Sequence, residues 1–405
     1  MTIGINAAAA IKQPRMGVEE YTYQLIKHLT MLPEAREHRF FLYVPSVKNK
    51  IPLNPLLKRG EEEGIFDFPL PENFEIKILR WPLPFLGTQI RLAWELLFRP
   101  IDILFIPVHV LPFFSPKNSV VTVHGLEYEY FPQYYSFWRR LYLRWGTKNA
   151  LKRASKIIAV SESTKNDLIK FYGGKIEKIK VVRHGIRISD FTPPFIKGGG
   201  EGFFKKSPLI PLFKGGKYLL YLGRIEAKKN IQGILEAYKI LKEEYKISHQ
   251  LVLAGAPGFG YSDLKLKIDN LLKIVLLDGI PQSGKNCKLK IIELGYVSED
   301  EKWQLLGNAD VFLFPSFYEG FGLPILEAQA TSVPVLTSFY SSMPEVAGEG
   351  ALFVNPQNPA QIAEAIFKII DDRVLRDRLI KSGWENIKRF SWKTCSRETL
   401  KILTE

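Results

Sequence analysis

The chain has 405 residues, enough for two or three domains of ordinary size. A hydrophobic share of 46% and a charged share of 24% exclude a wholly disordered, collagenous or coiled-coil chain, and two cysteines are too few for a disulfide framework. The formal charge of +14 favours a polyanionic partner, which leaves nucleic acid, an anionic membrane and a phosphorylated substrate as candidates.

The N-terminal segment, residues 3–11, is apolar but follows no basic segment. We therefore expect a buried strand and a small-residue turn there, not a signal peptide. No stretch stays apolar for the about 18 residues that a membrane-spanning helix needs. The shortage of cysteine suits a reducing compartment. The sequence thus predicts a cytoplasmic protein.

Apolar runs of strand length alternate with helical patterns along the chain, which is typical of parallel sheets covered by helices. In the first half, we expect strands at residues 2–6, 40–44, 75–79, 103–106, 119–123, 157–160 and 179–182, and helices at 19–32, 137–152 and 163–171. In the second half, we expect strands at 218–222, 250–254, 291–293, 311–314, 333–337 and 351–354, and helices at 230–244, 299–309, 322–330, 359–371 and 374–389.

The segment between the halves, residues 193–217, contains lysines, prolines and glycines and repeats a P-x-x-K-G-G pattern. Such a composition does not form a packed element, so we interpret it as a flexible inserted linker, with a basic functional arm as the alternative. The expected domains are therefore residues 1–192 and 218–385, and a C-terminal helix at 386–405 is expected to pack back on the first domain. A second irregular stretch, 274–288, is expected to be an enlarged loop.

Residues 279–286, GIPQSGKN, nearly match a phosphate-binding loop of the G-x4-G-K-[ST] type. The last position must supply a hydroxyl to Mg²⁺, and Asn286 cannot do so. The residues that follow have an extended rather than a helical pattern. We therefore do not interpret this segment as a nucleotide site. The glycine-rich residues 255–260 have the wrong order for a dinucleotide fingerprint and are expected to form a turn after a strand.

The most informative segment is residues 315–330, PSFYEGFGLPILEAQA. A strand is expected to end near Phe314, and a helix to begin near Leu323 with Pro324 in its first turn. Glu319 precedes this helix and Glu327 lies one turn inside it, so both acids can face one crevice at the carboxyl edge of a parallel sheet. The structural alternative for each acid alone is a solvated surface residue.

This segment resembles a specific motif of the retaining GT4-type glycosyltransferases, E-G-F-G-L-P-x-L-E-A, in which the two acids are eight residues apart. Further segments that resemble the family follow in the right order: VTVH at 121–124, SEST at 161–164, YLGR at 221–224 followed by Lys229-Asn230, LGYV at 294–297 and SSMPEV at 341–346. The resemblance implies an α/β chain with the GT-B fold, two Rossmann-like domains facing a central cleft. The early loop departs from the family, because Glu19 occupies the place of a glycine.

The resemblance also implies a site for a nucleoside diphosphate sugar (NDP-sugar). Arg224 and Lys229 would bind the diphosphate and take the place of a metal ion, because the leaving group gains negative charge. Glu327 would accept hydrogen bonds from the ribose hydroxyls, and Glu319 would face the sugar. The backbone amides of Phe321, Gly322 and Leu323 begin a helix and could hold sugar hydroxyls or phosphate.

Two residues of the first half complete the expected site. His124 follows an apolar strand directly, and by resemblance it contacts the donor sugar, with a structural turn histidine as the alternative. Gly17 lies between a strand and a helix, where its amide could approach the diphosphate. His109 and His184 follow similar strands, and for both the structural interpretation is favoured, with His109 as a weaker candidate for the acceptor site. No D-x-D pair occurs, so neither a metal nor a cofactor is expected.

The segment 128–156 combines aromatic residues with cations and is expected to contain a basic helix. Such a helix either lies on an anionic membrane surface or packs on the core with a solvated face, and the sequence does not separate these two. No recognised module supports nucleic-acid binding, so we expect none.

The resemblance, together with these residues, implies a retaining, metal-independent transferase of a mannose- or glucose-like hexose, acting in polysaccharide biosynthesis. The partners would be an NDP-sugar and a glycan or lipid-linked acceptor, with the protein in the cytoplasm or on the inner face of the membrane. The alternatives are another GT-B enzyme, of the phosphorylase type or one that modifies nucleotide sugars, and a non-catalytic nucleotide-sugar-binding scaffold.

Overall fold

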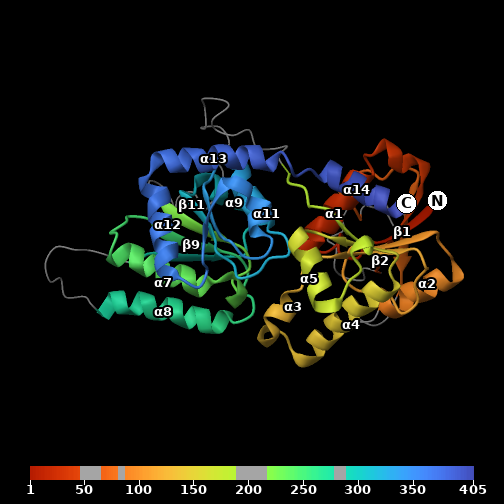
Figure 1. Ribbon diagram of the computed structural model, residues 1–405, viewed down its shortest axis with the longest axis horizontal. Coiled ribbons are helices and arrows are strands. Elements are labelled where there is room, and N and C mark those ends of the chain that lie inside the picture. The colour runs from red at the N-terminus through yellow and green to blue at the C-terminus, as the bar shows by residue number, and fades with distance from the viewer. Residues whose placement is uncertain (46–64, 81–86, 188–216, 278–288) are drawn as a thin grey trace, which may run out of the picture. The chain divides into compact units, whose positions relative to one another are not determined.

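The computed structural model describes residues 1–45, 65–80, 87–187, 217–277 and 289–405 (Figure 1). The chain forms two compact units. Unit 1 comprises Met1–Gly185 together with Phe390–Glu405, and unit 2 comprises Ile186–Arg389. Most of the expected linker, the near-match to a phosphate-binding loop and Cys287 lie outside the described residues. None of the helices in the described ranges is long and apolar enough to cross a bilayer.

Unit 1 is built on a parallel sheet of seven strands in the order β3-β2-β1-β4-β5-β6-β7. The strands are β1 (Thr2–Asn6), β2 (Arg39–Pro45), β3 (Phe74–Leu79), β4 (Ile103–Ile106), β5 (Ser119–Val123), β6 (Lys156–Ala159) and β7 (Ile179–Val181). The helices are α1 (Gly17–Leu29), α2 (Ala93–Phe98), α3 (Glu127–Tyr130), α4 (Phe137–Arg153), α5 (Glu162–Tyr172) and, from the end of the chain, α14 (Trp392–Thr404).

Both faces of the inner strands β4 and β5 are buried, which explains why these strands are apolar at successive positions. Side chains of a parallel strand alternate between the two faces. Phe105 and Val120 belong to one core cluster, which also contains residues of α1 and α14. Their neighbours Leu104 and Val121 belong to a second cluster on the other face. The C-terminal helix α14 packs against α1 and supplies the buried Trp392 to the first of these clusters.

Unit 2 contains a parallel sheet of six strands in the order β10-β9-β8-β11-β12-β13. The strands are β8 (Tyr218–Leu222), β9 (Gln250–Ala254), β10 (Ile291–Gly295), β11 (Val311–Phe314), β12 (Val335–Ser338) and β13 (Ala351–Val354). The helices are α7 (Ile231–Glu243), α8 (Tyr261–Leu277), α9 (Glu299–Asn308), α10 (Leu323–Ala330), α11 (Met343–Ala347), α12 (Pro359–Asp371) and α13 (Arg373–Ile387). β8 and β11 are neighbours, so the segments that follow them begin side by side.

The structure confirms the expected α/β class and, with two parallel sheets, the two Rossmann-like domains. Each expected strand is present with ends within two residues of the prediction. Ser161 caps α5 as expected, because its hydroxyl accepts a hydrogen bond from the Thr164 amide. The expected loop at 274–288 is wrong in its first part, since α8 continues through Leu277.

Candidate functional site

The first part of the site follows β8. Gly223 continues the strand with a positive φ of 147°, and the exposed Arg224 comes next. The buried Tyr221 hydroxyl donates to the Arg224 carbonyl at 2.8 Å and so fixes the backbone that carries this arginine. Arg224 forms no ion pair within 4 Å of any carboxylate in the described ranges, which leaves its charge available to an anion.

The short helical turn Ala227–Lys229 then leads to α7. Asn230 ends the turn in the left-handed region, with a φ of 59°, and caps α7 by accepting from the Gly233 amide at 3.2 Å. Its side-chain amide also donates to the Pro356 carbonyl at 2.6 Å. These bonds fix Lys229 directly before a helix N-terminus, where the helix dipole also favours an anion.

The glycine-rich residues 255–260 form the expected turn after β9 and pack on the loop that carries Arg224. The Gly255 amide donates to the Gly295 carbonyl at 2.7 Å, and the Ile225 amide donates to the Ala256 carbonyl at 3.0 Å. A Cβ on Gly258 would lie 2.7 Å from the Cγ of Arg224. Glycine is therefore needed for backbone packing here, which explains the composition without a dinucleotide site.

Gly255→Ala should disrupt this part of unit 2. Its Cβ would lie 1.8 Å from the Gly223 carbonyl oxygen, and its φ of +150° is one that alanine rarely adopts. We expect the free energy of unfolding to fall by about 3 kcal/mol or more. Gly260→Ala is the matched control: its φ is +76°, but its nearest contact would be 3.5 Å, so only about 1 kcal/mol is expected. Equal losses in urea titrations of the two variants would contradict this packing argument.

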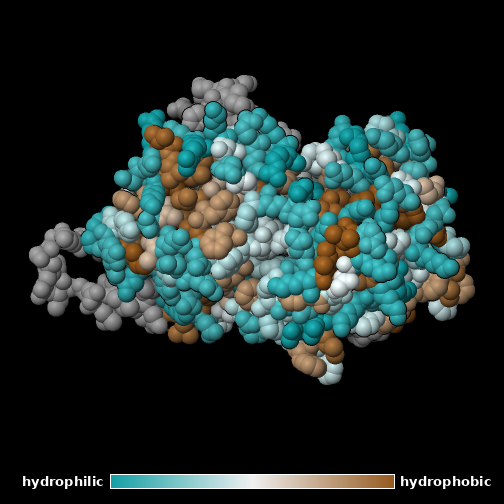
Figure 2. Space-filling model, viewed as in Figure 1, coloured by the Kyte–Doolittle hydropathy of each residue, from teal (hydrophilic) through white to brown (hydrophobic). Residues whose placement is uncertain are grey.

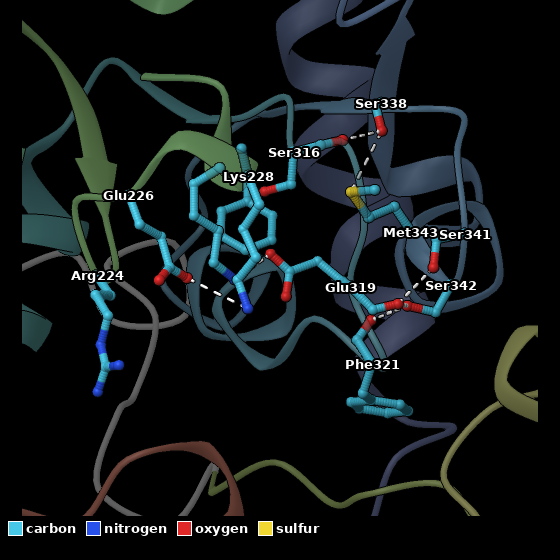
Figure 3. A network of polar contacts seen from close by, with 12 residues as sticks. Arg224, Glu226, Lys228, Ser316, Glu319, Phe321, Ser338, Ser341, Ser342 and Met343 are labelled. Carbon is cyan, nitrogen blue, oxygen red and sulfur yellow. Dashed lines mark hydrogen bonds and ion pairs between the residues drawn. The ribbon is translucent and has the colours of Figure 1, made fainter. Parts of the chain in front are cut away.

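The second part of the site is the turn between β11 and α10. Gly322 has a φ of 114° and precedes Leu323, where the helix begins with Pro324 in its first turn, as the sequence predicts. Two serines of the segment after β12 hold this turn (Figure 3). Ser341 donates to the Glu319 carbonyl at 2.5 Å, and the Ser342 hydroxyl lies within hydrogen-bond distance of the carbonyls of Glu319, at 2.8 Å, and Phe321, at 2.6 Å.

These two parts of the site meet. The Phe317 amide donates to the Lys228 carbonyl at 3.0 Å, which joins the loop after β8 to the loop after β11. The Lys229 ammonium donates to the Glu319 carboxylate, and both side chains are largely buried, with exposed fractions of 14% and 12%. The proximity of Glu319 also contributes, after burial, to a raised pKa of the Tyr221 hydroxyl. The expected diphosphate-binding lysine and the expected sugar-binding acid are thus direct partners.

Glu327 lies on α10 and has a lysine of its own. The Lys302 ammonium on α9 donates to the Glu327 carboxylate at 2.7 Å and to Glu299 at 2.9 Å. Burial opposes the charge on Lys302, but the two carboxylates outweigh it and raise the pKa of the ammonium. Neither Lys302 nor the serine pair was expected from the sequence. The SSMPEV segment drew attention to the serines, but no local pattern indicates Lys302.

In unit 1, His124 follows the carboxyl end of β5, as expected. Its Nε2 lies 2.7 Å from the Pro107 carbonyl oxygen, which can only accept, so Nε2 carries the proton. Burial and, after it, the neighbouring His109 together lower the pKa of His124 to about 3, against the raising effect of the Pro107 hydrogen bond. The imidazole is therefore neutral at pH 7, with Nδ1 as its acceptor atom.

Gly17 is the first residue of α1 and is exposed. Its φ is +28°, and a Cβ there would meet no atom within 4 Å, so backbone conformation rather than crowding favours glycine. Tyr21, one turn later, contacts the His124 ring edge-on with centroids 4.8 Å apart. Glu19, which replaces a glycine of the resembling family, lies 3.7 Å from the Lys12 ammonium.

Acid should destabilise unit 1 through its histidines. Burial lowers the pKa of His109, His124 and His184, and the His184 ring stacks on both Tyr21 and Trp392. The unfolded chain therefore binds more protons than the folded one as pH falls below about 6.5. Between pH 7.0 and 5.5, we expect each of these three histidines to lower the free energy of unfolding by about 1 kcal/mol. The His184→Phe variant should lose about 1 kcal/mol less than the wild type over the same range. A free energy that stays constant over this range would contradict the prediction.

Comparison with known proteins agrees with this geometry. A family model described as Glycosyltransferase Family 4 matches residues 16–190, and one described as Glycosyl transferases group 1 matches residues 204–385. The chain is 28% identical to an O-antigen chain mannosyltransferase B of Escherichia coli over 98% of both chains. It is also 28% identical to the O-antigen chain mannosyltransferase RfbU of Salmonella typhimurium, over 69% of each chain.

Solved structures share the fold over the whole chain at low sequence identity. Anabaena HepE, in complex with UDP and glucose, aligns with a TM-score of 0.64 and 16% identity over 100% of this chain and 99% of that one. WaaG, described as a glycosyltransferase involved in lipopolysaccharide biosynthesis, aligns with a TM-score of 0.65 and 16% identity over the full length of both chains. With two family models matching in sequence order and this fold, the chain belongs to the GT4-type glycosyltransferases and is a glycosyltransferase of GT-B fold.

Proposed function

We propose that this glycosyltransferase moves a mannose- or glucose-like hexose from an NDP-sugar to a hydroxyl of a glycan or lipid-linked acceptor in polysaccharide biosynthesis. The observation that carries the proposal is the contact between Lys229, on the loop that also carries the exposed Arg224, and Glu319 at the carboxyl edge of the unit 2 sheet. The names of the two mannosyltransferase relatives favour mannose among the hexoses.

The charges at this edge suit departure of a nucleoside diphosphate. Charge develops on the diphosphate as the glycosidic bond breaks, and preorganised cations stabilise it most where it develops. Arg224 is exposed and forms no ion pair with a carboxylate of the described residues, and Lys229 precedes the α7 N-terminus. Two cations and a helix end would do the work that a divalent metal does elsewhere, so we propose a metal-independent reaction.

The proposal gives the remaining residues distinct roles. Glu327 accepts from the ribose hydroxyls, and Glu319 faces the sugar. We assign the amides of Phe321, Gly322 and Leu323, at or just before the first residue of α10, to sugar hydroxyls or phosphate, because the dipole of a helix N-terminus favours such acceptors. In unit 1 we assign the amide of Gly17 to the diphosphate and the neutral His124 to the sugar. Retention of the anomeric configuration follows the family resemblance.

The direct test is release of NDP from a panel of GDP-mannose, UDP-glucose and related donors, with and without glycan and polyprenyl-linked acceptors. We expect one donor to react only when an acceptor is present, and we expect the same rate with and without EDTA. NMR of the product would give its anomeric configuration. NDP release that depends on inorganic phosphate, or that proceeds without any acceptor, would favour another GT-B enzyme. Donor binding without turnover would favour a scaffold. Activity lost to EDTA and restored by Mg²⁺ would refute metal independence.

We also propose that unit 1 contacts an anionic membrane through α4. This helix buries only small residues, Gly146, Thr147 and Ala150, so core packing does not account for its aromatic residues. Phe137 and Trp138 are 72% and 75% exposed. Figure 2 shows hydrophobic atoms projecting at the lower edge of the molecule, over the region of α3 and α4. Exposed cations interleave with these aromatics, as expected of a surface that binds anionic lipid; they are Arg139, Arg144, Lys148 and Lys152.

Co-sedimentation with vesicles tests this surface. Phosphatidylglycerol-containing vesicles should bind the protein and pure phosphatidylcholine vesicles should not, with binding reduced by salt. The double variant Phe137→Ser, Trp138→Ser should lose most binding. Leu266→Ser is the matched control, because Leu266 is 61% exposed on α8 of unit 2. If the double variant binds the vesicles as well as the Leu266→Ser control does, a role for α4 is refuted.

A further inference from the structure

Lys302 is a nearly buried cation that joins α9 to the candidate site. α9 begins at a capping box, in which Ser298 accepts from the Glu301 amide and the Glu301 carboxylate accepts from the Ser298 amide. This cap fixes the first turn of the helix and with it the backbone of Lys302. The lysine side chain is 14% exposed and reaches Glu327 on α10, which is 15% exposed.

The contact with Glu327 is more than a helix salt bridge. Lys302 already has a partner three residues back in its own helix, Glu299, at 2.9 Å. Glu299 is 60% exposed and is free to follow the lysine, so α9 does not need Glu327 for its charge balance. Glu327, by contrast, is largely buried, and the Lys302 ammonium contacts its carboxylate at 2.7 Å. The geometry therefore restrains Glu327 more than it restrains Lys302.

A carboxylate that accepts hydrogen bonds from both ribose hydroxyls must keep its two oxygens in a fixed orientation. A free glutamate side chain samples several rotamers, and ordering it on ligand binding weakens affinity. Lys302 occupies Oε1 of Glu327, which fixes the carboxylate plane and leaves Oε2 and the remaining lone pairs available to hydroxyl donors.

From these contacts we infer that Lys302 is a positioning residue that orients Glu327 for the ribose hydroxyls and thereby makes the enzyme selective for ribonucleotide over deoxyribonucleotide donors. This inference rests on the proposed role of Glu327. The ligand class is the ribose of a nucleoside diphosphate, recognised by a carboxylate whose direction a second residue sets.

The experiment compares ribose with 2′-deoxyribose in the same site. Titration calorimetry would measure the Kd of GDP and UDP and of their 2′-deoxy forms for the wild type and for Lys302→Met, Lys302→Arg and Glu327→Gln. Methionine keeps the apolar stem of Lys302, and arginine keeps the charge. Lys265→Met is the matched control, because Lys265 also joins two carboxylates of unit 2, Glu293 and Asp269. Thermal unfolding would be followed for each variant.

In the wild type we expect the ribonucleotide that binds to be preferred by roughly tenfold or more, the effect of a hydrogen bond to a charged group. Lys302→Met should reduce this preference to about twofold while 2′-deoxynucleotide binding changes little. Lys302→Arg should keep most of the preference and Lys265→Met all of it. A merely structural lysine would weaken both nucleotides equally, which would overturn the inference.

Two further outcomes separate this inference from the proposed function. In the first, Glu327→Gln loses the ribose preference while Lys302→Met keeps or strengthens it. In that case Glu327 binds the ribose without help from Lys302, and only the inference fails. If Glu327→Gln keeps the full preference, or the wild type has none, the proposed role of Glu327 is wrong and the inference fails with it.

Discussion

Lys229→Met should lower kcat/KM for sugar transfer by about 100- to 1,000-fold. This is the range observed when one preorganised group that stabilises developing negative charge is removed from an enzyme. Lys229 lies before the N-terminus of α7, where the charge of the departing diphosphate is proposed to develop. Initial rates of NDP release with the preferred donor would measure the effect.

Lys228→Met is the control for this prediction, because Lys228 is the adjacent lysine and lies 3.4 Å from Glu226. We expect its rate to stay within about threefold of the wild type. Loss of Lys229 also leaves Glu319 largely buried without its cation, so the single variant could lose activity by losing stability. The double variant Lys229→Met, Glu319→Gln should regain stability and stay inactive. Equal rate losses at both lysines would refute a specific role for Lys229.

Glu319→Gln should reduce sugar transfer and tighten the binding of free NDP by about tenfold. In the free protein, the Lys229 ammonium is neutralised by the Glu319 carboxylate, and a diphosphate must compete with this partner. Glutamine keeps a hydrogen-bond acceptor but removes the competing charge and its repulsion of the phosphates. An interaction with a charged group of about 1.4 kcal/mol corresponds to this tenfold change.

Glu226→Gln provides the comparison, since it removes the same charge from the neighbouring pair with Lys228. We expect its NDP affinity to stay within about threefold of the wild type. Calorimetric titration of NDP into both variants would measure the difference. Weaker NDP binding in Glu319→Gln would show that Glu319 supports the nucleotide directly, and it would reverse the roles assigned to the two acids.

Local sequence patterns predicted the sheets and the turns of the two loops of the candidate site well. Most strands are apolar runs, and in β3 charged residues alternate with apolar ones, the pattern of a half-buried strand. Such patterns depend little on the rest of the chain. The turn before α10 was predictable for the same reason, because Gly322 needs a positive φ and Pro324 suits a first helical turn. α8 was missed because its last residues, 274–277, are uniformly apolar and look extended, although Leu264 and Ile268, four residues apart, are buried at helical spacing.

The partners of the two acids could not be predicted. Lys229 and Glu319 are 90 residues apart, and they meet because β8 and β11 are neighbours in the sheet. Lys302 looks like any solvated lysine of a polar helix, and only the packing of α9 beside α10 reveals its contact with Glu327. The sequence therefore indicated candidate residues of the site but not how their charges are balanced.

The position of α14 determines the order in which the protein can be completed during synthesis. Unit 1 contains the beginning of the chain and its end, so the ribosome must make all of unit 2 before it supplies Trp392 to the unit 1 core. Until then, the α1 residues Tyr21 and Leu25, which are fully buried in the finished protein, lack this cover. A nascent chain would thus present an apolar surface to chaperones and proteases throughout elongation. A truncation at the C-terminus would damage the N-terminal unit.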